Sequence, residues 1–132
     1  MTPTELLAEA RKLIARPDAS TVGVWPRAAA FLVRQALEVA VDERWSADPV
    51  TEPMRHATMW SKLACLPSYL DKQAARQVAF AYAALSRACH YHHYELAPTA
   101  AELTNWITDV EALIAHLKQD ARTSRTVTEP VN

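Results

Sequence analysis

Hydrophobic residues recur along most of the chain at the three- and four-residue spacing of amphipathic helices. This pattern fills four long stretches, with one shorter apolar stretch between the second and the third long ones. Apolar residues at this spacing share one face of an α-helix, whereas a half-buried strand would alternate apolar and polar positions. The pattern predicts five helices, over about residues 2–16, 26–45, 54–66, 69–92 and 99–118.

Helix-stopping and helix-starting residues separate these stretches. Pro17, Pro67 and Pro98 fall at predicted ends and turns, where a missing N–H does no damage. Thr99-Ala-Ala-Glu102 has the pattern of a capping box, and Ser68-Tyr-Leu-Asp71 resembles one with aspartate at its last position. Residues 121–132 are rich in threonine and lack an amphipathic pattern, so we expect a disordered C-terminal tail there.

The composition supports an all-α fold. The 132 residues include a single glycine, Gly23, whereas tight β-hairpins usually need glycine-containing turns. Helices joined by short connections pack as antiparallel neighbours. We therefore predict one domain over residues 1–120, an all-α antiparallel bundle of four to five helices.

Charge and cysteine content limit the surroundings of the protein. The formal net charge is −1, so any RNA binding must depend on a local basic patch. Two cysteines form no disulfide framework, and the N-terminus lacks the basic and apolar segments of a signal peptide. No apolar run approaches the roughly 20 residues of a membrane span. We expect a cytoplasmic protein that does not enter membranes.

Chemically reactive side chains are concentrated at the predicted end of the fourth helix. Histidine can accept or donate a proton near neutral pH, and arginine can grip a phosphate through its planar fork. RNA can thus be cut without metal if a histidine moves the proton and an arginine stabilises the phosphate. The segment holds Arg87, Cys89, His90, Tyr91, His92, His93 and Tyr94 within eight residues.

On this interpretation Arg87 clamps the phosphate and His92 is the acid or base. One pair of Arg87 and His92 is too few groups for the whole reaction, and two chains that meet at this segment would supply two such pairs. The five-residue separation corresponds to about 140° around an ideal helix. Either the helix ends or distorts near Tyr91, or the two side chains approach the site from different sides.

The spacing Arg87, four residues, His92, one residue, Tyr94 resembles the R-x4-H-x-Y motif of HEPN toxins. The segment Arg27-Ala-Ala-Ala-Phe-Leu-Val-Arg-Gln-Ala-Leu-Glu38 is similar to the early HEPN helix, so that the resemblance covers residues 28–117. It implies a HEPN-like bundle that acts as a dimeric, metal-independent endoribonuclease, a toxin or defence component without a cofactor. It also implies that Tyr94 belongs to the catalytic site, where it positions the site or receives AMP from a partner nucleotidyltransferase antitoxin, which silences the nuclease.

Two departures from the motif bear on activity. Ala88 stands where active members often have a polar residue, and the additional His90 and His93 leave open which histidine acts. Tyr91 is a supporting candidate. Glu38 is expected as a helix-surface acid, with a hydrogen bond to the His92 region as a further hypothesis.

Two other interpretations remain open. Cys89 and His93 lie one helical turn apart and could share a metal, with His90 near Tyr94 or Glu95, although no complete ligand set has zinc-site spacing. Alternatively, the bundle is a non-catalytic module that binds a partner. Its tryptophans would then anchor the core or an interface, and its cations, among them Arg27 and Arg34, would lie on solvated faces or line an RNA groove.

Overall fold

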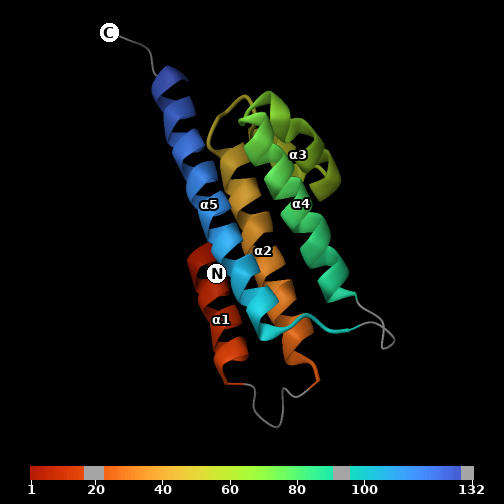
Figure 1. Ribbon diagram of the computed structural model, residues 1–132. Coiled ribbons are helices and arrows are strands. Elements are labelled where there is room, and N and C mark those ends of the chain that lie inside the picture. Colours follow the sequence, from red (N-terminus) through yellow and green to blue (C-terminus); the bar gives the residue numbers. More distant parts are fainter. Residues whose placement is uncertain (17–22, 91–95, 129–132) are drawn as a thin grey trace.

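The computed structural model describes residues 1–16, 23–90 and 96–128, and within these ranges the regular structure is helical. The elements are α1 (Pro3–Ala15), α2 (Trp25–Ser46), the 3₁₀ helix η1 (Glu52–His56), α3 (Met59–Cys65), the 3₁₀ helix η2 (Leu66–Ser68), α4 (Lys72–Cys89) and α5 (Ala100–Thr128). Helices α1, α2, α4 and α5 alternate in direction (Figure 1), which confirms the all-α bundle; its HEPN-like character stays a prediction. None of the described helices is both long and apolar enough to cross a membrane.

Helix α2 is the centre of the bundle, because α1, α4 and α5 all pack against it (Figure 1). Its apolar stripe is the one that the sequence predicted, and Val33, Leu37 and Val41 are completely buried. Full burial of such a side chain contributes about 1.5–3 kcal/mol to folding. The other helices add Leu6, Val78, Leu85, Leu103, Ile107, Val110 and Leu117 to the buried set.

Polar side chains cap the helix starts largely as predicted. Thr2 and Glu5 form a reciprocal capping box at α1, and Thr99 accepts from the backbone N–H of Glu102 at 3.1 Å. The predicted cap at Ser68 is wrong, since Ser68 closes η2 and Asp71 caps α4 by accepting from the N–H of Ala74 at 3.0 Å. Asp71 can take this position because it follows the end of the 3₁₀ turn.

Two predicted boundaries need further correction. The third helix is divided into η1 and α3, because Ala57 and Thr58 adopt extended backbone and Thr58 caps α3. Helix α5 runs to Thr128, so the predicted end near Lys118 and the tail beginning at residue 121 are wrong for residues 121–128. An established helix propagates without an amphipathic pattern. Residues 129–132 lie outside the described part.

A buried ion pair joins the end of α2 to α5. The Nε of Arg44 donates to Asp120 Oδ2 at 2.6 Å, and its Nη2 lies 3.4 Å from the carbonyl oxygen of Tyr69. Only 3 % of the Arg44 side chain is exposed. The neighbouring Trp45 is buried and packs edge-to-face on the Tyr69 ring, at 5.3 Å between centroids. Together these contacts fix one end of the bundle.

Candidate functional site

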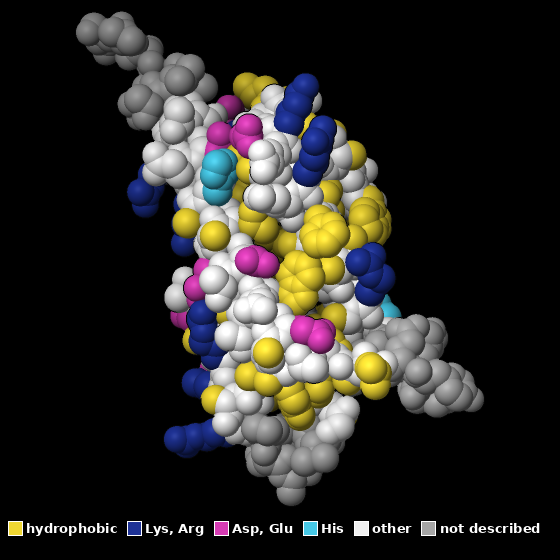
Figure 2. All heavy atoms as spheres, viewed as in Figure 1, with side chains coloured by type: hydrophobic (Ala, Val, Ile, Leu, Met, Phe, Trp, Pro, Cys, Tyr) yellow, Lys and Arg dark blue, Asp and Glu magenta, His cyan; other side chains and the backbone are white. Residues whose placement is uncertain are grey.

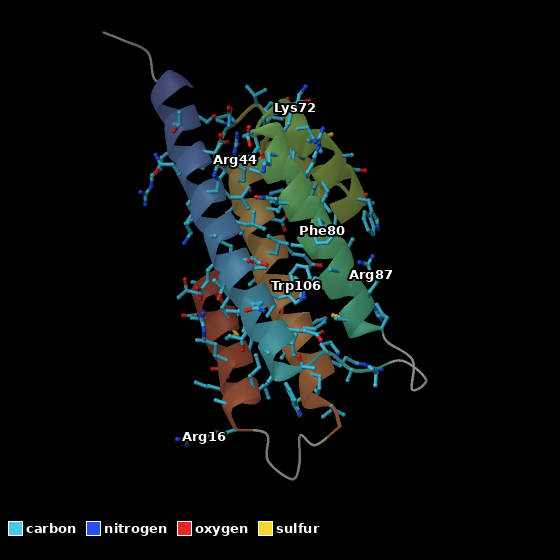
Figure 3. All side chains as sticks on the ribbon, in the orientation of Figure 1. Arg16, Arg44, Lys72, Phe80, Arg87 and Trp106 are labelled. Carbon is cyan, nitrogen blue, oxygen red and sulfur yellow. The ribbon has the colours of Figure 1, made fainter. Side chains whose placement is uncertain are left out.

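The end of α4 places the first of the predicted site residues. Arg87 lies in the last turn of α4 with an exposed side chain (Figure 3). Cys89 is the last helical residue, and His90 follows as the C-cap, with its N–H donating to the carbonyl oxygen of Arg87 at 3.1 Å. The side chain of His90 is exposed. Arg87 and His90 are therefore both accessible at the same end of the bundle.

Helix α4 ends earlier than the sequence predicted. His90 has φ −120° and ψ 23°, outside helical geometry, so the helix that carries Arg87 ends at Cys89. The helix ends where an alanine-rich segment gives way to Tyr91-His-His-Tyr94, whose residue types are weaker helix formers. This agrees with the first of the two alternatives given above, in which the helix ends near Tyr91. Tyr91, His92, His93 and Tyr94 themselves lie outside the described residues, and their roles stay predictions.

A shallow groove of about 600 Å³ lies between the start of α2 and the end of α4. It combines an exposed aromatic ring with arginine side chains, directly beside the C-cap of α4. Its floor is apolar, and the imidazole of His90 borders it. The lining residues are Val24, Arg27, Ala28, Phe31, Leu32, Arg34, Cys89 and His90.

Behind the groove, a polar cluster crosses the interface between α2 and α4. Arg34 Nε lies 3.6 Å from Glu38 Oε1, and the guanidinium sits 5.4 Å from the centre of the Phe31 ring. Glu38 also accepts a hydrogen bond from the Tyr82 hydroxyl at 3.3 Å. Burial, followed by the nearby Glu38 carboxylate, raises the pKa of Tyr82. Tyr82 therefore stays a neutral donor toward Glu38 at physiological pH.

This cluster corrects the interpretation of Glu38 as a surface acid. Its side chain is only 31 % exposed, and its partners come from α2 and α4. Glu38 lies within the helix interface because Tyr82 approaches from α4, which the spacing along α2 does not reveal. The hypothesis of a hydrogen bond to the His92 region stays untested, since His92 is outside the described part.

Cys89 points into the small apolar cluster formed with Ala29, Ala30 and Leu103. Burial raises the pKa of the Cys89 thiol, and Arg34 opposes this shift. A protonated, buried thiol is a poor nucleophile and a poor metal ligand. Among the residues that the structure describes, no three His, Cys, Asp or Glu side chains gather as a cation site. The suggested metal site shared by Cys89 and His93 stays a prediction, because His93 lies outside the described residues.

Sequence reasoning named Arg34 only among the cations that lie on solvated faces or line an RNA groove, although a more specific signal was present. Arg27, Phe31, Arg34 and Glu38 follow one another at spacings of four, three and four residues. Residues at these spacings share one face of a helix. A face that carries two arginines and a phenylalanine beside the apolar stripe is unusual for a purely solvated surface.

Comparison of the chain with protein-family models gave no match, and no curated protein or solved structure matched it.

Proposed function

We propose that this protein is a metal-independent endoribonuclease of the HEPN type, acting as a toxin or a defence component. The observation that carries the proposal is the exposed pair Arg87 and His90 at the end of α4, of which His90 lines a groove that contains two arginines and an aromatic ring. Because the net charge of the chain is −1, such a local concentration of cations is what binding to RNA would need.

In the proposed reaction, Arg87 binds the scissile phosphate and stabilises the charge that grows on it. His92 takes the proton from the 2′-hydroxyl, whose oxygen attacks the phosphorus. The bond to the 5′-oxygen breaks, and that oxygen receives a proton from a second histidine of the segment or of a second copy. The products are a 2′,3′-cyclic phosphate and a 5′-hydroxyl.

The groove beside α4 would hold the nucleotide next to the cleaved bond. The face of Phe31 can stack on a base, which contributes about 1–3 kcal/mol in single-strand binding. Arg34 is held beside this ring by Glu38, so its charge is already positioned before RNA arrives. The Tyr82 hydroxyl supports Glu38 from α4 and thereby ties the groove to the helix that carries Arg87.

Regulation follows from the same resemblance. A partner nucleotidyltransferase would attach AMP to Tyr94, which adds a phosphate and a base within two residues of His92. The added group would occupy the space and the cationic contacts that RNA needs. An intact-mass measurement on protein co-expressed with such a transferase would detect the modification.

The decisive experiment is cleavage of single-stranded RNA by the purified protein in EDTA. We expect cleavage by the wild type, and a loss of about a hundredfold or more in Arg87→Ala and in His92→Ala. Arg16→Ala and His56→Ala are matched controls, since both side chains are exposed. Figure 3 shows Arg16 well away from Arg87, and His56 lies beside Glu43 and Ser46 near the end of α2. Equal losses in the controls would contradict the assignment.

The alternative is a non-catalytic module that binds a partner protein. Ala88 beside the motif arginine and the exposed Phe80 ring on α4 favour this role. Absence of cleavage by folded wild type whose mass shows no modification would select it over the nuclease.

A further inference from the structure

A second groove, of about 520 Å³, runs along the junction of α4 and α5. At its centre the rings of Phe80 and Trp106 lie 6.1 Å apart, and Phe80 is 65 % exposed (Figure 3). Figure 2 shows apolar side chains gathered over this face, with charged groups beside them. A large aromatic ring exposed at the centre of an apolar strip is typical of an interaction surface.

The two walls of this groove carry opposite charge. Arg76 of α4 and Asp109 of α5 line the groove from its two walls. Lys72 and Arg87 add positive charge along α4, which contains no acidic residue, and Glu102 adds negative charge in the first turn of α5. Within the described ranges, Arg76, Arg87, Glu102 and Asp109 make no ion pair, although all four side chains are exposed. One face therefore holds both halves of a complementary charge pattern.

The opposite charges of α4 and α5 also lie at matching positions along the helix axes. Helices α4 and α5 are antiparallel, and the Phe80–Trp106 contact fixes their register (Figure 1). Arg76 lies four residues before Phe80 and Asp109 three residues after Trp106, so both are displaced toward the same end. Both line the same groove. Toward the other end, Arg87 and Glu102 are likewise displaced in a common direction.

We propose that a second copy of this chain docks on this groove, with α4 of each copy against α5 of the other. A two-fold axis parallel to the helices leaves the position of every residue along the helix axes unchanged. It places α4 of one copy opposite α5 of the other. Arg76 of one copy then faces Asp109 of the second copy, and the contact forms twice. An axis perpendicular to the helices would instead set α4 on α4, with the cations of both copies facing one another.

The arrangement removes the exposed rings from water and forms an antiparallel four-helix contact, a common packing for such helices. Its axis also brings both Arg87 side chains to the same end of the dimer. The catalytic relevance of this placement rests on the proposed nuclease function, because that reaction needs catalytic side chains from more than one chain. The dimer itself does not depend on that function.

Sedimentation velocity of the full chain tests the proposal, over concentrations up to about 200 µM. We expect a dimer in the wild type, and a dissociation constant raised about tenfold or more in Arg76→Asp and in Asp109→Arg, because each creates two like-charge contacts. An equimolar mixture of these two variants should dimerise again, since both contacts then pair opposite charges. Lys118→Asp, on the far side of α5, is the matched control and should dimerise like the wild type.

Several outcomes would overturn the proposal. A monomeric wild type rejects the dimer, and a dimer insensitive to either charge reversal places the interface elsewhere. A mixture that stays monomeric rejects the packing of α4 on α5. Circular dichroism confirms folding, and Phe80→Ala provides a variant without charge change that should raise the dissociation constant about tenfold. No RNA is present in the assay, so failure of the nuclease proposal would leave the result interpretable.

Discussion

Replacing Asp120 by alanine tests how the buried charge of Arg44 is held. The two side chains pair at 2.6 Å, but their surroundings differ, because the arginine is 3 % exposed and the aspartate 27 %. Without Asp120, the guanidinium keeps only the 3.4 Å contact to the Tyr69 carbonyl and cannot turn into water. Without Arg44, in contrast, Asp120 can hydrate. The structure therefore predicts unequal costs for the two halves of one ion pair.

The magnitudes follow from the chemistry of buried charge. Breaking a buried pair by removing one partner costs about 3–5 kcal/mol when the remaining charge is trapped. We expect about 3 kcal/mol for Asp120→Ala, at the low end because Asp120 is partly exposed. Arg44→Met fills most of the volume with apolar atoms and should cost about 1 kcal/mol, because the Asp120 carboxylate left behind is partly exposed and can be hydrated.

Urea denaturation followed by circular dichroism measures both values. The free energy of unfolding should fall about 2 kcal/mol further in Asp120→Ala than in Arg44→Met. Glu43→Ala is the control for losing an exposed carboxylate, because Glu43 of α2 makes no ion pair among the described residues and lies outside the proposed dimer face. A larger loss in Arg44→Met than in Asp120→Ala would refute the reasoning from burial.

Two other predictions concern titratable groups. Tyr82→Phe removes the 3.3 Å hydrogen bond to Glu38 and should cost about 0.5–1.5 kcal/mol in urea denaturation. The folded state raises the pKa of Tyr82 above its ordinary value of 10.0. The contribution of Tyr82 to the free energy of unfolding is therefore fully present below pH 10 and declines as the pH rises through the folded pKa. Tyr82→Phe should lack this decline. Cys65 should react with Ellman's reagent at least about tenfold faster than the buried Cys89, measured in Cys89→Ser and Cys65→Ser; equal rates would contradict the burial of Cys89.

Periodicity predicted the core well because it reports directly on burial. The apolar spacing predicted helices over residues 26–45 and 99–118, and Leu103, Ile107 and Leu117 of the second of these are buried. Capping chemistry identified Thr99 correctly, since its accepting hydroxyl and the donating N–H of Glu102 lie three residues apart in the sequence. Such local signals need no knowledge of the tertiary structure.

The failures arise where distant segments decide the structure. Asp71 rather than Ser68 caps α4 because a 3₁₀ turn intervenes, and α5 extends beyond its apolar stripe. Glu38 and Arg34 belong to an interface only because Tyr82 of α4 packs on them. At the candidate site, Arg87 and His90 could be found from residue type and spacing. The groove beside them could not, because it exists only where the start of α2 meets the end of α4.

The central position of α2 also has a consequence for motion. Its backbone amides lie beneath α1, α4 and α5, so no single neighbour can detach and expose the whole helix. Amide protons there should exchange with solvent only when the entire domain unfolds, while the ends of α4 and α5 exchange through local opening. The bundle would thus keep its central helix rigid while the end of α4, with Arg87 and His90, stays free to adjust to an RNA or a protein partner.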